Sequence, residues 1–145
     1  MTNIELSVLV EKSRERVYAM LKNLEEFPRF MRDIRKLEVV ERAPHRLVTH
    51  WEVNVDGAMV AWKEEDIFDD KAMNVKFKML EGDYTAYSGR WDIKDLSRKT
   101  KINLTVDIDW GAPAFEKVIG SILRRKEKRY LKSMLMAMKN HLNKA

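Results

Sequence analysis

The sequence predicts an α+β fold in which a curved, seven-stranded antiparallel sheet wraps around one long C-terminal helix. Alternating apolar and polar residues separated by turn residues mark the strands along the 145-residue chain. The connections between the last six strands are only a few residues long, so these strands must be antiparallel neighbours. The terminal helix alone is long enough to cover the apolar face of such a sheet.

The N-terminal part of the chain predicts a strand followed by two short helices. Apolar residues alternate with polar ones over Ile4–Val10, which indicates a strand with one buried face. Ser13 can cap a helix whose apolar stripe ends at Leu24. We expect Pro28 to break this helix and to begin a second short one at its first turn.

Six further strands follow, rich in Val, Ile, Trp, Tyr and Thr, with Pro, Gly and Asp in the turns between them. Their predicted ranges are Ile34–Glu41, Arg46–Asp56, Ala58–Phe68, Met73–Leu80, Tyr84–Lys94 and Lys101–Trp110.

The C-terminal segment shows helical spacing across about 30 residues, a length of roughly 45 Å at 1.5 Å per residue. The apolar positions are Phe115, Val118, Ile119, Ile122, Leu123, Tyr130, Met134, Met138 and Leu142. We expect these elements to form a single domain over residues 1–145.

The composition limits the chemistry. The chain has no cysteine, which excludes disulfides, thiolate nucleophiles and cysteine-based zinc sites and fits a cytoplasmic location. It has no window of about 18 apolar residues and no secretory signal at its start, so we expect no membrane span. His45, His50 and His141 lack metal-ligand spacing, and no nucleotide or triad motif is present, so we expect no metal and no cofactor.

Two stretches resemble motifs of a known superfamily. Leu24–Ile34 is similar to a lid helix of the form leucine, acidic, aromatic-Pro-x-Phe. Gly82-x-Tyr84 followed by Gly89-x-Trp91 is similar to a strand motif of the same superfamily. With the element order, the whole chain resembles the START-like helix-grip (SRPBCC) superfamily, and within it the polyketide cyclase/dehydrase and coenzyme-Q-binding branch, which also includes ribosome-association toxin proteins.

The resemblance implies a hydrophobic tunnel between sheet and terminal helix, entered near the short helices and the hairpin loops. It carries over no single catalytic motif. The residues that we expect to contact a ligand are Phe27, Phe30, Met31, Trp51, Trp62, Phe77, Met79, Tyr87, Trp91, Ile119, Leu123 and Met134.

Aromatic residues and one glycine share the predicted inner face. Trp51, Trp62 and Trp91 lie on different strands and line one side of the sheet if their faces match, either as ordinary core or as a cavity wall. Gly89 falls between the rings of Tyr87 and Trp91, and the gap it leaves is either a bulge or room for a ligand.

An acidic pair accompanies these rings. Glu64 and Asp66 share a face with Trp62 in the period-2 pattern. Either a bulge turns both acids to solvent, or Glu64 reaches the cavity with a raised pKa and serves as an acid/base. Lys126 and Tyr130, one turn apart on the terminal helix, are candidates to face it, and Tyr130 is the second candidate acid/base.

The positive charge of the chain is concentrated in its last helix. Residues 115–145 hold nine Lys/Arg and two Asp/Glu, a charge of +7 against +5 for the whole chain. Arg124, Arg125, Lys128 and Arg129 form either a solvated outer face or a surface for an anionic membrane or ribosomal RNA. We expect no DNA partner.

Three functions compete on this basis. The first is the binding, by carriage or sequestration, of a hydrophobic small molecule such as a lipid, quinone or polyketide. The second is a cyclase/dehydratase activity that uses a cavity acid/base. The third is interaction with ribosomes or RNA through the basic helix.

Overall fold

The structure is a computed structural model that describes the backbone of residues 1–111 and 113–144 and the side chains of residues 1–111 and 119–144. In chain order its elements are β1 (Thr2–Val10), α1 (Arg14–Lys22), the short 3₁₀ helix η1 (Leu24–Arg29), β2 (Ile34–Ala43), β3 (Arg46–Val55), β4 (Ala58–Asp69), β5 (Asn74–Gly82), β6 (Ala86–Asp95), β7 (Thr100–Asp109) and α2 (Pro113–Lys144).

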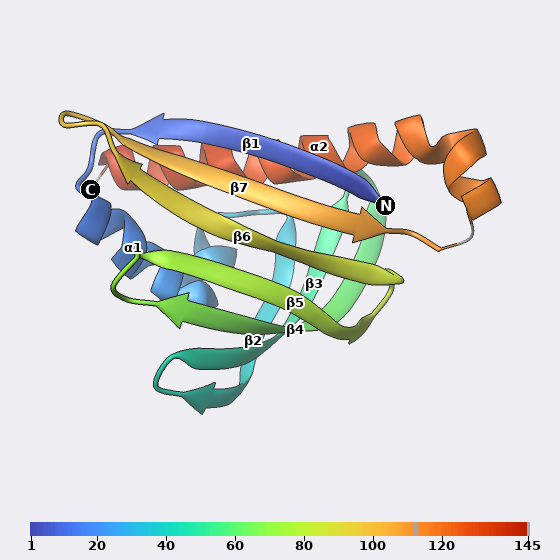
Figure 1. The fold of residues 1–145 in the computed structure, drawn as a ribbon, viewed down its shortest axis with the longest axis horizontal. Helices are drawn as coiled ribbons and strands as arrows, with labels where there is room; N and C mark the ends of the chain where they lie inside the picture. Colours follow the sequence, from blue (N-terminus) through green and yellow to red (C-terminus); the bar gives the residue numbers. More distant parts are fainter. Residues whose placement is uncertain (112, 145) are drawn as a thin grey trace.

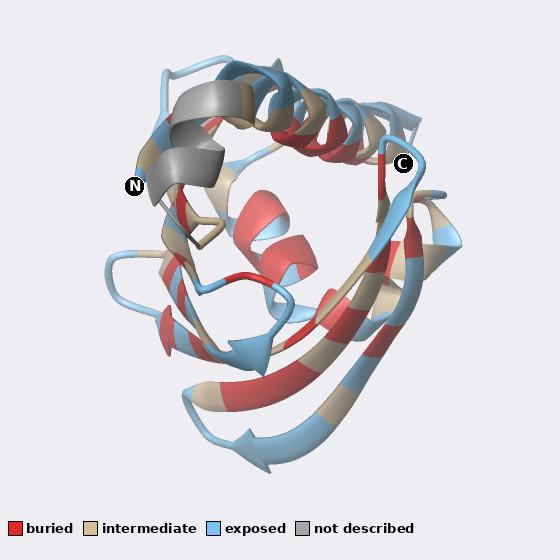
Figure 2. Ribbon diagram, turned by 90° about the vertical axis from the view of Figure 1, so that its right-hand side faces the viewer, coloured by how far each residue is buried: buried red, intermediate tan, exposed pale blue. Residues whose placement is uncertain are grey.

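The strands form one seven-stranded antiparallel sheet in the order β1-β7-β6-β5-β4-β3-β2. Consecutive strands from β2 to β7 are neighbours, and β1 pairs with β7 at the far edge. The sheet curves around α2, which lies across its concave side next to β1, as Figures 1 and 2 show. The predicted α+β fold, with two short helices before the second strand, is confirmed.

Alternating side chains of the strands form the core on the concave side of the sheet. In β7 the burial alternates strictly, with Ile102, Leu104, Val106 and Ile108 buried. Figure 2 shows buried residues on the faces of α2 and of the sheet that meet each other. The side chains of Phe115 and Val118, two positions of the predicted helical stripe, lie outside the described residues.

The boundary between the two short helices differs from the prediction. The side chain of Ser13 caps α1 as expected, since its Oγ accepts a hydrogen bond from the Arg16 N–H at 3.1 Å. However, α1 ends at Lys22 with Asn23 as its C-cap, and η1 begins at Leu24 and contains Pro28. A short 3₁₀ turn accepts a proline near its end because only one N–H donor is lost.

The glycines of the β5–β6 region allow backbone and rings to approach closely. A Cβ at Gly82 would lie 2.4 Å from the Cβ of Trp62, its partner across the sheet. A Cβ at Gly89 would lie 2.7 Å from the ring of Phe77 and 2.1 Å from the carbonyl oxygen of Thr105. The gap expected at Gly89 is therefore neither a bulge nor ligand space, because the ring of Phe77 fills it.

No helix within residues 1–111 and 113–144 is long and apolar enough to cross a membrane.

Candidate functional site: a buried aromatic cavity with carboxyl groups

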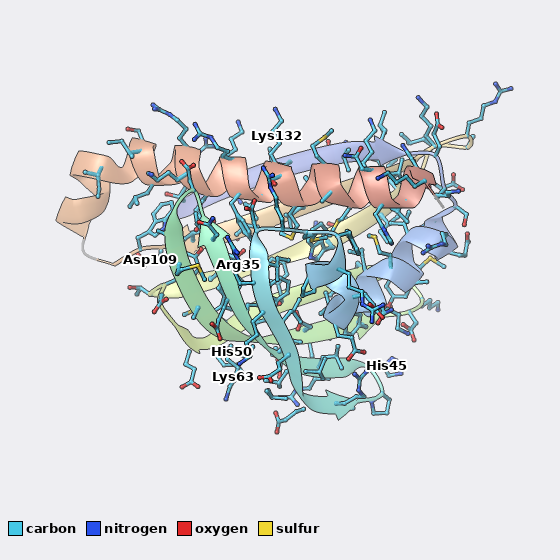
Figure 3. All side chains as sticks on the ribbon, turned by 180° about the vertical axis from the view of Figure 1, so that it is seen from behind. Arg35, His45, His50, Lys63, Asp109 and Lys132 are labelled. Atoms are coloured by element: carbon cyan, nitrogen blue, oxygen red, sulfur yellow. The ribbon has the colours of Figure 1, made fainter. Side chains whose placement is uncertain are left out.

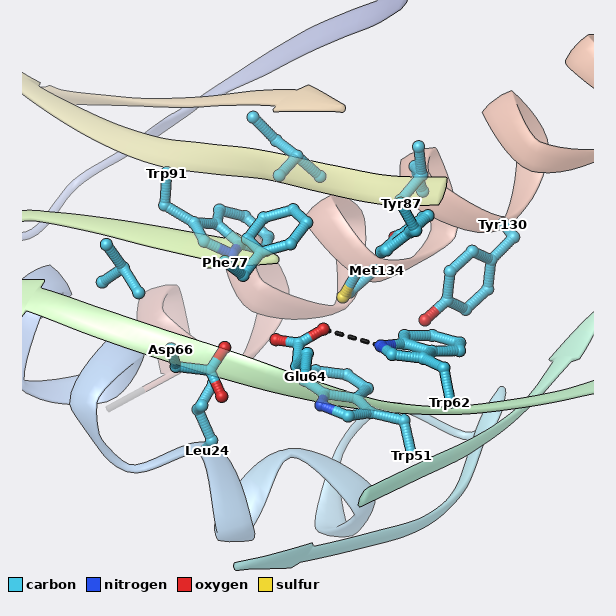
Figure 4. A pocket seen from close by; sticks show the side chains of 13 residues that line it. Leu24, Trp51, Trp62, Glu64, Asp66, Phe77, Tyr87, Trp91, Tyr130 and Met134 are labelled. Carbon is cyan, nitrogen blue, oxygen red and sulfur yellow. Dashed lines mark hydrogen bonds between the residues drawn. The ribbon is translucent and has the colours of Figure 1, made fainter. Parts of the chain in front are cut away.

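A small cavity lies between the inner face of the sheet and α2, and we call it the inner cavity (Figure 4). The sequence-predicted residues that line it are Trp51, Trp62, Glu64, Phe77, Tyr87, Trp91, Tyr130 and Met134. The remaining lining residues are Leu24, Asp66, Val75, Leu104 and Leu131. The inner cavity has a volume of about 20 Å³, close to the space that one water molecule needs.

The aromatic wall follows from strand register. Trp51 and Trp62 are directly opposite each other on β3 and β4, and their rings stack at 5.5 Å with an interplanar angle of 10°. The ring of Tyr87 on β6 lies 5.1 Å from that of Trp62. Trp91 also lies on β6, on the same face of the strand as Tyr87, and lines the same space. The three indoles therefore line one side of the sheet, as the alternation predicted.

Two carboxyl groups lie inside this wall. Glu64 and Asp66 are 3% and 2% exposed, so the alternative in which both acids face solvent is wrong. A bulge is present, but it lies on the neighbouring strand. Glu64 pairs with Met79 and Lys63 with Glu81, so Leu80 of β5 is the extra residue and the alternation of β4 continues unbroken.

Hydrogen bonds hold the two carboxyl groups. The indole N–H of Trp62 donates to Oε1 of Glu64 at 2.7 Å. The hydroxyl of Thr49 donates to Oδ2 of Asp66 at 2.6 Å and accepts from the indole N–H of Trp51 at 2.9 Å. None of the described residues that line the inner cavity is basic, so neither acid has a cationic partner there.

Burial dominates the acidity of this pair. The pKa of Glu64 is raised well above its ordinary value, first by burial and then by the charge of Asp66. Burial also raises the pKa of Asp66, to about 6. The hydrogen bonds of Asp66 with Glu64 and Thr49 lower this pKa but do not cancel the effect of burial. Burial therefore favours the protonated form of Glu64, which can donate a proton or a hydrogen bond.

A second pocket, which we call the outer pocket, opens near the hairpin loops at the other end of the molecule from α1 and η1. It has a volume of about 150 Å³. Its described lining residues are Val55, Ala58, Val60, Asp83, Tyr84, Trp110, Leu123, Lys126 and Glu127. It lies at the hairpin loops, one of the two places where the sequence predicts an entrance.

Tyr84 and Glu127 separate the two spaces. The hydroxyl of Tyr84 donates a short hydrogen bond to Oε1 of Glu127. The ring of Tyr84 stacks on Tyr87 of the inner cavity at 4.7 Å, and Tyr130 follows Glu127 by one turn of α2. The outer pocket and the inner cavity thus meet at this hydrogen bond.

Two buried polar atoms at this junction have no hydrogen-bond partner among the described residues. They are Oε2 of Glu127 and the hydroxyl of Tyr130. Burial raises the pKa of Glu127 to about 7, with the Tyr84 hydrogen bond opposing it. Burial raises the pKa of Tyr130 well above its ordinary value, and the nearby charges of Glu127 and Glu64 raise it less. The hydroxyl of Tyr130 therefore stays protonated.

The other predicted ligand contacts lie away from the inner cavity. Phe27 is fully buried behind the wall, where its ring meets the edge of Trp51 at 6.3 Å. Phe30 instead stacks on His141 at 4.0 Å and lines a surface groove. Leu123 lines the outer pocket. Met31 is buried, and Met79 and Ile119 are half-buried, without lining either space.

Phe30 and Met31 do not line the inner cavity because they lie after the end of η1. The chain leaves η1 at Arg29, and both residues follow it, on the way to β2. Their side chains therefore pack against the C-terminal half of α2 or into the core below it, not into the space that Leu24 reaches at the start of η1.

The four basic residues of α2 that we expected to form a surface lie on the exposed side of the helix. Figure 3 shows charged side chains pointing outward from α2, with Lys132 among them. Arg124, Arg125, Lys128 and Arg129 are all exposed. Arg129 pairs with Asp56 in the β3–β4 turn at 2.9 Å, and Lys126 approaches the same carboxylate at 3.6 Å, so Lys126 does not face Glu64.

The sequence reasoning missed Glu127, Tyr84 and Asp66 as members of the site. Glu127 lies in a run of basic residues, and a single acid in such a run is usually interpreted as an exposed ion-pair partner. Its spacing from Leu123 and Tyr130 was the available signal, because residues three and four apart share a helix face. Asp66 had the same signal as Glu64, namely its shared face with Trp62.

The described residues contain no group of three or more His, Cys, Asp or Glu side chains that could hold a metal ion.

The curved sheet wrapped around one long helix is the helix-grip fold, and comparisons with proteins of known structure agree. A Thermus thermophilus protein of known structure is 25% identical, with a TM-score of 0.91 and 97% of each chain covered. The Zhui aromatase/cyclase from a Streptomyces species is 19% identical, with a TM-score of 0.88 over 97% of this chain and 93% of the other. A START superfamily protein from Mycobacterium smegmatis is 16% identical, with a TM-score of 0.83 over 98% and 97%.

Residues 10–135 match the model of the family described as polyketide cyclase/dehydrase and lipid transport. The chain belongs to this family. A comparison with curated proteins finds no match. The description of the family covers polyketide cyclases, dehydrases and lipid transport, and one of these structural neighbours, Zhui, is an aromatase/cyclase.

Proposed function

We propose that the protein binds a hydrophobic small molecule, such as a lipid, a quinone or a polyketide ring, between the sheet and α2. The observation that carries this proposal is the combination of an aromatic wall with two buried carboxyl groups that have no basic partner among the described lining residues. Aromatic rings alone are typical of any core. Buried carboxyl groups cost stability in a plain core, so their presence favours a site that uses them.

Binding requires the inner cavity to widen, because about 20 Å³ is too small for an organic ligand. We propose that the ligand enters by the outer pocket and displaces Tyr84 from Glu127. Met134, on the α2 side of the inner cavity, can then adjust, because methionine has three rotatable bonds and fits irregular shapes.

Apolar contacts alone would give weak binding. Burying about 300 Å² of apolar ligand surface contributes roughly 7–8 kcal/mol at ~25 cal/mol/Å². Association costs at least about 4 kcal/mol of this, which leaves an affinity near the millimolar range. Tighter binding needs the polar groups of the site, Glu64, Tyr130 and Glu127.

Native mass spectrometry of freshly purified protein tests the proposal, together with extraction into organic solvent. The panel for added ligands is an isoprenoid quinone, a long-chain alcohol and a flat polycyclic phenol. We expect a bound apolar molecule after purification or stoichiometric uptake from the panel. A protein that is empty as purified and takes up no member of the panel would count against the proposal.

A second candidate function is a cyclase or dehydratase, and the state of Glu64 favours it. This carboxyl group is buried, and burial raises its pKa, which favours the protonated form that a general acid needs before it donates its proton. Tyr130 is the second candidate, because its hydroxyl points into the space that Glu64 faces and has no partner among the described residues (Figure 4).

The matched variants are Glu64→Gln and Glu65→Gln. Glu65 is the next residue of β4, faces the other side of the sheet and pairs with Arg46 at 2.6 Å. If Glu64 is the acid, turnover of a poly-β-ketone substrate falls by about 10²–10⁴-fold in Glu64→Gln and stays unchanged in Glu65→Gln. Equal turnover in both variants would remove Glu64 from the reaction and leave Tyr130→Phe as the next variant to measure.

A partner at the basic face of α2, whether an anionic membrane or the ribosome, stays a prediction, as do a cytoplasmic location and a single domain. Binding to either partner through Arg124, Arg125, Lys128 and Arg129 should weaken steeply as salt rises, which co-sedimentation measures.

A further inference from the structure

Among the described side chains of α2, Glu127 is the one acidic or basic group that is buried in the core. It is 2% exposed within a helix segment whose neighbouring basic side chains are exposed. Tyr84 satisfies one carboxyl oxygen, and the other, Oε2, has no hydrogen-bond partner among the described residues. Glu127 also lines the outer pocket, so its side chain borders a space that a small molecule can enter, and Oε2 becomes reachable when the ligand displaces Tyr84 as proposed above.

The charged groups around the outer pocket leave Glu127 unpaired. Asp83 is engaged by the backbone, since its Oδ2 accepts from the Ala61 N–H at 2.7 Å. Lys126, the basic residue of the described lining, directs its ammonium group to Asp56 at 3.6 Å. The other ionisable groups that influence or adjoin Glu127 are the phenols of Tyr84, Tyr87 and Tyr130.

The path beyond Glu127 is also acidic. The described residues lining the inner cavity include Glu64 and Asp66 and no basic side chain. Beyond Lys126, a ligand carboxylate on this path would find no basic described side chain to pair with, whereas a cation would meet carboxyl groups and the faces of aromatic rings.

We propose that the outer pocket is a subsite for a hydrophobic amine, whose ammonium group pairs with Oε2 of Glu127 while its ring lies against Val60, Trp110 and Leu123. The inference rests on the proposed function and narrows its ligand to amines with an apolar body. An ammonium group carries three donors, so it can satisfy Oε2 of Glu127 and still donate to further acceptors. A pocket of about 150 Å³ is large enough for one aromatic ring.

Three probes with the same phenylethyl body test this proposal by calorimetry: 2-phenylethylamine, 2-phenylethanol and 3-phenylpropanoate. Near pH 8 we expect the amine to bind about tenfold or more tightly than the alcohol, because charge-assisted hydrogen bonds are roughly twice as strong as neutral ones. We expect no measurable binding of the acid. The preference for the amine should be lost in Glu127→Gln and kept in Glu38→Gln, which removes an exposed acid from β2.

The wild-type protein offers a second test that needs no variant. Since burial raises the pKa of Glu127 to about 7, lowering the pH from 8 to 6 protonates this group. Amine binding should then weaken several-fold, while alcohol binding should not change.

The amine subsite would be wrong if the amine and the alcohol bound equally, or if the amine affinity did not depend on pH or on Glu127. Neither result would contradict the proposed function. The absence of binding by all three probes would also overturn the subsite. The broader proposal fails separately, if the purified protein is empty and the lipophilic panel does not bind.

Discussion

The three buried acids of this protein differ in how their oxygens are satisfied. Glu64 accepts from an indole N–H and Asp66 from a hydroxyl, whereas Glu127 has a phenol on one oxygen and no described partner on the other. Burial raises the pKa of each of them. The acids therefore hold protons at higher pH in the folded protein than in the unfolded chain.

A dependence of stability on pH follows for Glu127. Its pKa rises from 4.5 to about 7 on folding, so the folded state binds the proton more tightly. This contribution is fully present below pH 4.5 and is lost as the pH rises through 7. Between pH 5 and 8 the loss amounts to roughly 2–3 kcal/mol of unfolding free energy.

Urea unfolding of the wild type and of Glu127→Gln over this pH range measures the contribution. Over this pH range the unfolding free energy of the variant should fall by about 2–3 kcal/mol less than that of the wild type, because glutamine does not titrate. Glu64 and Asp66 titrate in both proteins, so the difference isolates Glu127. Parallel curves for the two proteins would show that Glu127 is not held in the low-dielectric site described above.

Gly89 gives a second prediction at the scale of one residue. A methyl group there would lie 2.1 Å from the backbone oxygen of Thr105 and 2.7 Å from the ring of Phe77. Gly89→Ala should cost about 1–3 kcal/mol or more, as overpacking usually does. Ser88→Ala, on the opposite face of the same strand, should stay within about 0.5 kcal/mol. Thermal or urea unfolding checks both, and equal stabilities would show that the ring of Phe77 does not occupy this gap.

At the scale of elements, α2 acts as one wall of the inner cavity and supplies the polar groups at its junction with the outer pocket. Residues on its inner face pack on the sheet, and the same face carries Glu127, Tyr130 and Met134 one turn apart. Filling the space along this face should block ligand binding without removing the helix.

Met134 and Met136 provide a matched pair for this prediction. Met134 is buried and lines the inner cavity, whereas Met136 is 41% exposed on the other side of α2. Met134→Trp should lower ligand affinity by at least about tenfold and cost about 1–3 kcal/mol of stability. Met136→Trp should change neither. Unchanged affinity in Met134→Trp would place the ligand elsewhere.

Sequence reasoning reached the elements and much of the wall for a simple physical reason. Period-2 alternation fixes which face each strand residue occupies, so Trp51, Trp62 and Trp91 could be placed on one side before any coordinates. It could not decide whether Glu64 is buried, because alternation does not show which strand carries a bulge. The extra residue is Leu80 of β5, and β4 stays regular.

The sequence also could not predict the volume of the space between the sheet and α2. It depends on how rings such as that of Phe77 settle beside a glycine, which is a matter of three-dimensional packing. Glu127 was missed because a charged run suggests a solvated surface, although its helical spacing from Tyr130 places it on the inner face.

At the scale of the whole molecule, the curved sheet and α2 enclose a space that is nearly closed in this conformation and acidic along the path that leads to it. The proposed function requires that space to open for a ligand. Methyl NMR of the protein with labelled methionines observes this directly, since its nine methionines include Met134 at the inner cavity and Met59 and Met136 on the surface.

Saturation with the tightest-binding member of the lipophilic panel should shift the Met134 methyl resonance strongly and leave those of Met59 and Met136 in place. A Met134 resonance that does not move at saturation, or shifts confined to the two surface methionines, would contradict a binding site between the sheet and α2.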